Sequence, residues 1–218
     1  MTTDVLLVFL DANILAKPVT RTLLLVGGVP SRFRAVWSAT AEHEASRHMR
    51  SRATPLSQIR RRFGIELSIT GREAARFTQT RESDRQILAD AAEAGAQFLI
   101  TGDVDDFGSR DLASVKVSAT HPDLFLAEKM TRAAYTAVID LFVERQVNPP
   151  TSSAQFHAAL ARKHPRLFEV HADLYDIAPV VSDEAEPAVI FRGTRCLRCE
   201  HLSSESASPL DGLCTGCR

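Results

Sequence analysis

Three aspartates that follow an apolar stretch are the residues whose types and spacing first suggest chemistry. After the predicted strand 97–101 the chain continues as Thr101-Gly102-Asp103-Val104-Asp105-Asp106. Carboxylates a few ångströms apart repel and raise one another's pKa unless a cation neutralises them. Glycine and aspartate are also ordinary turn residues, so the cluster alone fits either a solvated turn or part of a cation site.

Three acids elsewhere favour the cation site. Asp11 directly follows the apolar run 5–10, Glu44 falls in a predicted helix, and Asp84 lies where another helix should begin. If the strands before Asp11 and Asp103 are neighbours in a parallel sheet, both acids lie at the same edge, where α/β proteins bind ligands. Carboxylate oxygens suit Mg²⁺ or Mn²⁺, which can activate water and neutralise charge on a phosphate.

Alternating strands and helices should position these acids. The run 5–10 is apolar without alternation, as expected for a central strand covered on both faces. Further strands are predicted at 33–37, 65–69, 97–101 and 115–117, and helices at 20–26, 39–49, 56–63, 71–80, 84–94, 124–130, 133–146, 151–162 and 165–175. Ser38 is the predicted cap of the second helix, and Ser83 or Asp84 that of the fifth. This order predicts an α/β protein with a mostly parallel sheet between helices.

The 218 residues, 44% of them hydrophobic, suffice for one medium domain with appendages. We divide the chain into an α/β core at 1–121, a helical extension at 122–177, a linker at 178–194 and a cysteine-containing unit at 195–218. The linker is predicted from its proline, valine and acidic residues.

The final unit carries the strongest single motif, Cys196-x2-Cys199-x14-Cys214-x2-Cys217. Two such pairs supply four thiolates at the spacing of a tetrahedral structural zinc site, and a unit this small has too few apolar residues to fold alone. Disulfides and redox thiols are the less favoured alternatives in a reducing compartment. Arginines flank the unit, so the zinc ribbon either contacts RNA or is a purely structural or partner-binding unit.

Four motifs together resemble those of the PIN-domain ribonucleases, and among them the bacterial toxins of VapBC type. They are Leu-Asp-Ala-Asn-Ile-Leu at 10–15, Trp37-Ser38 followed by Glu44, Asp-Arg-Gln-Ile-Leu-Ala-Asp-Ala at 84–91, and Ile-Thr-Gly-Asp-Val-Asp-Asp-Phe at 100–107. The similarity continues to about residue 175, through a helical extension seen in one branch of these toxins. It implies a PIN-like core with a parallel sheet, whereas the zinc ribbon is outside the usual toxin pattern.

This resemblance implies a metal-dependent endoribonuclease that binds one or two Mg²⁺ or Mn²⁺ ions. By position, the catalytic acids are Asp11, Glu44, Asp84 and Asp103, with Asp11, Asp84 and Asp103 as metal ligands, and Asn13 and Thr101 as supporting groups. Asp106 is an alternative to Asp103.

Glu42 is likewise an alternative to Glu44. The two are two residues apart and therefore point from different faces of one helix, so that only one should reach the site. We prefer Glu44, because its distance from Trp37 fits the motif.

Charge and other motifs narrow the function further. The net charge of −1 predicts no nucleic-acid partner by itself, but the chain from 32 to 85 is rich in arginine. There, Arg60, Arg61 and Arg62 are either RNA-binding residues or a solvated face. The histidines at 43 and 48 are five apart, which excludes the HExxH spacing of a zinc protease.

The expected partners are an RNA substrate, a second copy of the chain in a homodimer, and an antitoxin protein if the toxin interpretation holds. Neither a signal peptide nor a membrane-spanning run is evident in the sequence, so we expect a cytoplasmic protein with no membrane contact. A housekeeping RNA-processing nuclease and a non-catalytic RNA-binding or scaffold protein are the alternative functions.

Overall fold

A five-stranded sheet organises the computed structural model, which describes residues 5–146, 148–178, 189–203 and 207–218. The strands run in the order β2 (Phe33–Val36), β1 (Leu6–Leu10), β3 (Phe98–Ile100), β4 (Ser118–Thr120) and β5 (Phe191–Arg192). The first four are parallel, and β5 is antiparallel to β4. The predicted α/β class with a mostly parallel sheet is therefore confirmed.

Strand β1 lies inside the sheet, between β2 and β3, and both of its faces are covered. Val8, Phe9 and Leu10 are fully buried, as a continuous apolar run requires. Leu10 pairs in register with Ile100 of β3, so the residues that follow the two strands, Asp11 and Thr101, are neighbours at one edge of the sheet. This register brings the first and the last of the acidic motifs together.

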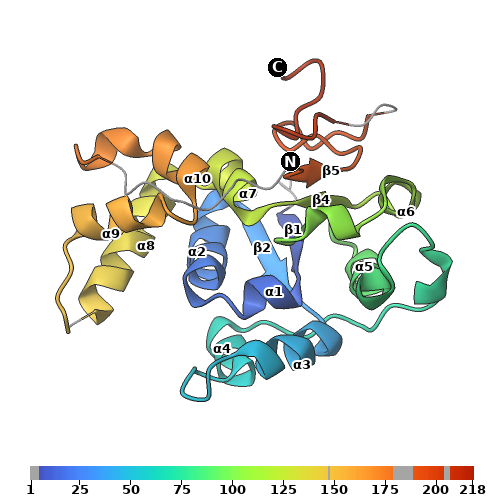
Figure 1. The fold of residues 1–218 in the computed structure, drawn as a ribbon, viewed down its shortest axis with the longest axis horizontal. Helices are drawn as coiled ribbons and strands as arrows, with labels where there is room; N and C mark the ends of the chain where they lie inside the picture. The colour runs from blue at the N-terminus through green and yellow to red at the C-terminus, as the bar shows by residue number, and fades with distance from the viewer. Residues whose placement is uncertain (1–4, 147, 179–188, 204–206) are drawn as a thin grey trace.

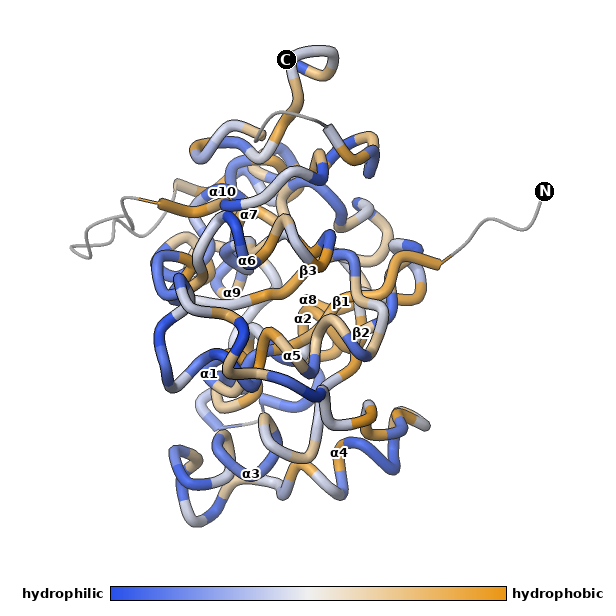
Figure 2. Tube along the Cα trace, turned by 90° about the vertical axis from the view of Figure 1, so that its right-hand side faces the viewer, coloured by the Kyte–Doolittle hydropathy of each residue, from blue (hydrophilic) through white to orange (hydrophobic). Residues whose placement is uncertain are grey.

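Helices cover both faces of the sheet and form a lobe at one side (Figure 1). They are α1 (Ala12–Leu15), α2 (Pro18–Gly28), α3 (Ala39–His48), α4 (Leu56–Phe63), α5 (Arg85–Glu93), α6 (Ser109–Ser114), α7 (Pro122–Lys129), α8 (Arg132–Arg145), α9 (Ser153–Leu160) and α10 (Pro165–Val170). Helices α8, α9 and α10 make up the lobe, and α3 and α4 lie together on the opposite side of α1 from β4. In Figure 2 the strands at the centre are mostly hydrophobic, whereas α3 carries many hydrophilic residues.

Two predicted elements are wrong. The segment 65–69 is not a strand, because its only pairing is an isolated bridge between Ser68 and Ser38, outside the strands of the sheet. The segment 71–80 forms only a 3₁₀ turn at Ala74–Arg76. Its backbone amides are bound by side chains instead of by a helix: Gly71 donates to Asp90, and Thr80 donates to Asp111 at 2.7 Å.

The last parallel strand also lies three residues later than predicted. Residues Val115 and Lys116 end helix α6 in a turn, in which Lys116 has a left-handed backbone with φ of 58°. The predicted strand 115–117 is therefore replaced by β4 at Ser118–Thr120. Helix α6 itself was not predicted.

Part of the predicted linker belongs to the sheet. Residues 179–188 lie outside the described residues, but β5 at Phe191–Arg192 pairs with β4. The unit that follows β5 packs beside the end of the sheet, where Figure 1 shows it next to β4 and β5. The division of the chain into domains stays a prediction.

Candidate acidic site and cysteine cluster

Asp11 is the buried centre of the acidic site. It follows β1 and caps α1, where its Oδ1 accepts a hydrogen bond from the amide of Ala12 at 2.6 Å. Its Oδ2 accepts from the Thr101 hydroxyl at 2.7 Å and from the Asn13 amide at 2.9 Å. Only 5% of the residue is exposed, so the carboxylate is held in one orientation.

Asn13 joins the ends of the two central strands. Besides Asp11, its Nδ2 donates to Asp103 Oδ2 at 2.9 Å and to Thr101 Oγ1 at 3.1 Å. Its Oδ1 accepts from the amide of Gly102 at 3.1 Å. The side chains predicted as acid and supporting groups at these positions therefore form one hydrogen-bonded network.

The negative charges of Asp84 and Glu44 act on the Asp11 carboxylate of this network. Burial raises the pKa of Asp11 to about 7, and the negative charges of Asp84 and Glu44 add to that increase. Burial, and then the charges of Asp106 and Glu44, raise the pKa of Asp84, although the Ser83 hydroxyl donates to its Oδ2 at 2.8 Å and opposes the rise. Asp84 precedes α5 but makes no side-chain cap, so its carboxylate is available to the site.

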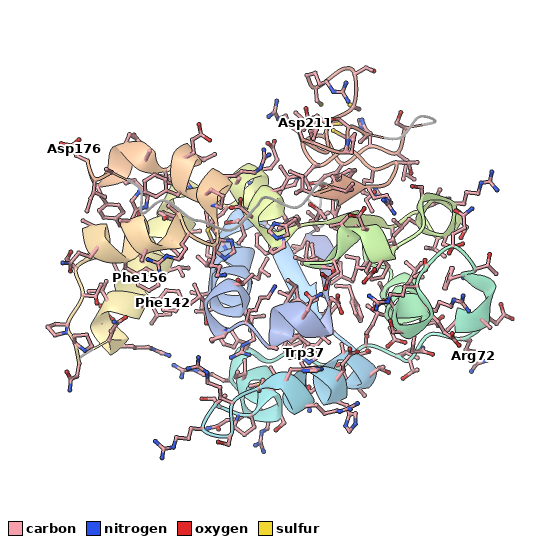
Figure 3. The ribbon with its side chains drawn as sticks, in the orientation of Figure 1. Trp37, Arg72, Phe142, Phe156, Asp176 and Asp211 are labelled. Carbon is pink, nitrogen blue, oxygen red and sulfur yellow. The ribbon has the colours of Figure 1, made fainter. Side chains whose placement is uncertain are left out.

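Glu42 and Glu44 have different surroundings on α3. Glu42 Oε2 accepts from Trp37 Nε1 at 2.8 Å and from Arg60 Nε at 3.3 Å. Figure 3 labels Trp37, which lies between α1 and α3. Glu44 is half-buried and interacts with Asp11 and Asp84 through charge. Glu42 is therefore bound by other side chains, whereas Glu44 shares the charge environment of Asp11 and Asp84.

Asp103 and Asp106 also differ in their partners. Asp103 is exposed and is linked to Asp11 through Asn13. Asp106 forms an ion pair with Arg81 at 3.0 Å, and its backbone carbonyl accepts from the Arg81 amide. Arg81 was not predicted as part of the site, because no spacing pattern links two residues 25 positions apart.

The ligand atoms of these acids are of the kind that a hard cation prefers. They are carboxylate oxygens, and a divalent ion would relieve the repulsion between them. Asp11, Asp84 and Asp103 would hold it, with Glu44 adding charge. Their oxygens are spread more widely than the ligands of a closed metal site. Among the described residues, the four cysteines are the only group of three or more His, Cys, Asp or Glu side chains whose ligand atoms lie within 4.8 Å of one another.

The cysteine cluster has the compact arrangement of a structural metal site. Cys196, Cys199, Cys214 and Cys217 are free thiols whose sulfur atoms all lie within 4.8 Å of one another. Cys196 is buried. Burial alone would raise the pKa of its thiol, but hydrogen bonds from the backbone of Cys199 and Cys214 outweigh it and lower the pKa to about 6. Four convergent sulfurs could hold a structural metal such as zinc.

The predicted arginine patch is only partly free. Arg60 is engaged with Glu42, whereas Arg61 and Arg62 are exposed at the end of α4. Lys17 was not predicted, yet its Nζ lies 3.2 Å from the position that a Cβ atom at residue 102 would occupy, beside the Asn13 network. Its only sequence signal is that it follows the first motif by two residues.

Fold and sites together define an α/β protein with a mostly parallel sheet, an acidic network at the ends of β1 and β3, and a four-cysteine cluster. The chain matches no family model, no curated protein and no solved structure. Within the described residues, none of the helices has the length and apolar content needed to cross a membrane.

Proposed function

We propose that the protein is a metal-dependent endoribonuclease of the PIN-domain class, and that it is the toxin of a VapBC-type pair. The observation that carries the proposal is the network in which Asn13 joins Asp11 to Asp103 across the ends of β1 and β3. The charges of Glu44 and Asp84 act on the same carboxylate. Two acids after neighbouring strands, Asp11 and Asp103, together with two that act on Asp11 through charge, fit the four motifs through which the sequence resembles that class.

The protein's own residues prepare this site for phosphodiester hydrolysis. Thr101 and Asn13 hold Oδ2 of Asp11, and the Ala12 amide holds Oδ1, so the carboxylate keeps its direction without a rearrangement during the reaction. When bound, Mg²⁺ or Mn²⁺ supplies an activated water and neutralises charge on the phosphate. Burial raises the pKa of Asp11, whereas the hydrogen bonds from Thr101 and Ala12 oppose that rise and favour the ionised carboxylate.

The cysteine cluster adds a structural zinc ion in this proposal. The unit contacts the core through two ion pairs at the C-terminal end of α7: Arg198 with Glu128 at 2.6 Å and Lys129 with Glu200 at 2.5 Å. A ribbon fixed to the core in this way also supports the second candidate, an RNA-processing nuclease, because it is not part of the usual toxin pattern.

The deciding experiment is cleavage of a mixed RNA pool with Mn²⁺ by the wild type, Asp11→Asn and Asp84→Asn. Glu144→Gln is the matched control, because this carboxylate is exposed on α8, away from the acidic site. We expect cleavage by the wild type and the control only. Equal cleavage by all four proteins would overturn the assignment of the acids, and no cleavage by any of them would favour a non-catalytic RNA-binding protein.

Growth of cells that express the protein distinguishes a toxin from an RNA-processing nuclease. Arrest of growth on expression of the wild type, relieved by Asp84→Asn and by a co-expressed antitoxin, supports the toxin. Normal growth, together with RNA cleavage in vitro, supports RNA processing. The proposed homodimer is checked by sedimentation of the purified chain.

A further inference from the structure

A pocket of about 810 Å³ opens outside the acidic network. It lies where the start of α2 and the end of α3 approach α7, α9 and α10, on the side of the molecule that carries the helical lobe (Figure 1). Its volume is within the range of sites that bind small molecules or parts of larger ligands. Nothing in the acidic motifs accounts for it.

The rim of this pocket is basic. Its charged lining consists of Lys17, Arg21, Arg50, Arg162, Lys163 and Arg166 against one acid, Asp123, among the lining residues that the structure describes. The amides of Arg166 and Leu167 donate to the two carboxylate oxygens of Asp123 at 3.1 and 3.0 Å. Lys17, Arg50 and Arg162 are exposed and form no ion pair with any described residue.

Two histidines in the wall of the pocket have lowered pKa values, chiefly because they are buried. His164 is 2% exposed, and its Nδ1 has no hydrogen-bond partner among the described atoms. Burial lowers the pKa of His164 to about 3, and His121, Lys17 and Lys163 add to the decrease. Burial lowers the pKa of His121 to about 4, with Lys17 and Arg166 contributing. Both imidazoles are neutral at pH 7, so the wall offers a buried polar nitrogen instead of a further cation.

An aromatic ring and aliphatic side chains form the rest of the lining. Phe156 lines the pocket and stacks on Phe142, with ring centroids 4.6 Å apart and planes 22° from parallel. Figure 3 labels the two rings, side by side between α8 and α9. Leu124, Leu160 and Ile190 complete the apolar surface. An aromatic platform beside unpaired cations is the combination with which proteins bind single-stranded nucleic acid.

Lys17 makes the pocket continuous with the acidic site. It lines the pocket, and its Nζ also approaches Gly102, whose amide donates to Asn13. A polyanion bound along the basic rim of the pocket therefore reaches the acidic network within a few of its own units. An acidic peptide would match the charge of the rim but carries no nucleobase to stack on Phe156.

We propose that this pocket binds a short single-stranded segment of the RNA that flanks the phosphate to be cleaved. A base stacks on Phe156, and its neighbouring phosphates lie against Arg50, Arg162 and Lys17. The assignment of the segment as substrate rests on the nuclease function proposed above. Binding itself does not require cleavage.

The test measures binding of a fluorescein-labelled single-stranded RNA of mixed sequence by anisotropy, without added Mg²⁺ or Mn²⁺, at several salt concentrations. The variants are Arg50→Ser with Arg162→Ser, and Phe156→Leu. Arg72→Ser is the control, because Arg72 is also exposed and forms no ion pair with a described residue, but lies on the far side of the molecule (Figure 3).

We expect the double variant to bind at least about tenfold more weakly and to reduce the slope of log K against log salt by about 1.4, since a contact to single-stranded phosphate contributes about 0.7. Phe156→Leu should weaken binding about fivefold or more without changing the slope, because stacking carries no charge. The control should match the wild type.

Wild-type affinity and slope in both pocket variants would overturn the proposal, as would an acidic peptide that binds the pocket when RNA does not. The two proposals fail separately. Cleavage of RNA together with normal binding by the pocket variants refutes the pocket alone. Pocket-dependent binding without cleavage by the wild type refutes the nuclease alone.

Discussion

The two glutamates on α3 show how side-chain partners separate residues of the same type. Glu42 is held by Trp37 and Arg60, so its charge is already compensated. Glu44 is half-buried near Asp11 and Asp84, where three carboxylates repel one another. In the proposed function a cation relieves that repulsion, which assigns the charge of Glu44 to metal binding and that of Glu42 to the stability of α3.

We therefore expect Glu44→Gln to reduce Mn²⁺-dependent RNA cleavage by about tenfold to 100-fold, the usual cost of losing a group that supports metal ligands. Glu42→Gln should retain activity but lower the free energy of unfolding by about 1–2 kcal/mol, since it weakens two hydrogen bonds. Initial rates and denaturant unfolding, followed by the fluorescence of the single tryptophan, Trp37, measure the two effects. Loss of activity in Glu42→Gln instead would reverse the assignment.

At the residue scale, the sequence predicts acids that end strands better than it predicts their partners. Asp11 and Asp103 were placed together because parallel strands end at one edge, and the register of Leu10 with Ile100 brings them within reach of Asn13. The Arg81–Asp106 ion pair could not be predicted, because it depends on how a loop without regular structure returns to the sheet. The position of Lys17 beside the Asn13 network could not be predicted from the sequence either.

At the element scale, β5 couples the cysteine unit to the acidic turn. Arg192 of β5 donates to the carbonyls of Asp105 and Phe107 and pairs with the Asp105 carboxylate at 2.8 Å. These acceptors lie in and beside the 3₁₀ turn Val104–Asp106, which directly follows Asp103. Arg192 is thus a positioning residue for the turn, and the strand that carries it leads directly into the cysteine unit.

We expect Arg192→Ala to lower kcat of RNA cleavage by about tenfold or more, because a small displacement of a reacting group can cost up to about 100-fold. The Mn²⁺ concentration for half-maximal activity should rise, while the zinc content stays unchanged. Arg192→Lys should recover part of the activity, since it keeps one donor. Steady-state rates at varied Mn²⁺ and metal analysis provide the readouts.

Arg198→Ala is the matched control for this prediction. It removes an ion pair between the same unit and Glu128 of α7 but leaves the acidic turn untouched. Its activity should stay near that of the wild type. An equal loss in the two alanine variants would mean that Arg192 acts only by attaching the unit to the core.

The sequence predicts helices and strands correctly where the hydrophobic periodicity is strong. It fails where side chains distant in sequence accept hydrogen bonds from the backbone amides. Helix α4 was predicted at its observed bounds, and Ser38 caps α3 as expected. The segment 71–80 failed because Asp90 and Asp111, distant in sequence, bind its amides. Strand β5 has only two residues, which is too short for any alternation to indicate it.

On the scale of the whole molecule, the lobe of α8, α9 and α10 packs against the core through buried polar groups as well as apolar ones. His164 bridges the two parts: its Nε2 lies 3.0 Å from Thr20 Oγ1 of α2, and its Nδ1 lies 3.9 Å from Asp123 Oδ1 of α7. The sequence indicated the helices of this lobe but left its histidines unassigned. Their burial depends on the packing between helices, which helical periodicity alone does not determine.

The buried His164 should make the stability of the whole chain depend on pH. Burial lowers the pKa of its imidazole from 6.5 in the unfolded chain to about 3 in the folded protein, and Lys17, Lys163 and His121 reinforce the decrease while the carboxylate of Asp123 faces the same ring. Between these values the unfolded chain binds more protons than the folded one. The contribution of His164 is therefore fully present above pH 6.5 and is lost as the pH falls toward 3.

At pH 5 this loss is about 2 kcal/mol, because 1.5 pH units below 6.5 correspond to about 1.4 kcal/mol each. We expect His164→Gln, which carries no titrating group, to lose about 2 kcal/mol less than the wild type between pH 7.5 and pH 5, although it starts from a lower stability. Denaturant unfolding at the two pH values measures the difference. His43→Gln, a change at an exposed position on α3, should retain the pH dependence of the wild type. If His164→Gln retained it too, the imidazole would not be held neutral between the lobe and the core, and another buried group would be responsible for destabilisation in acid.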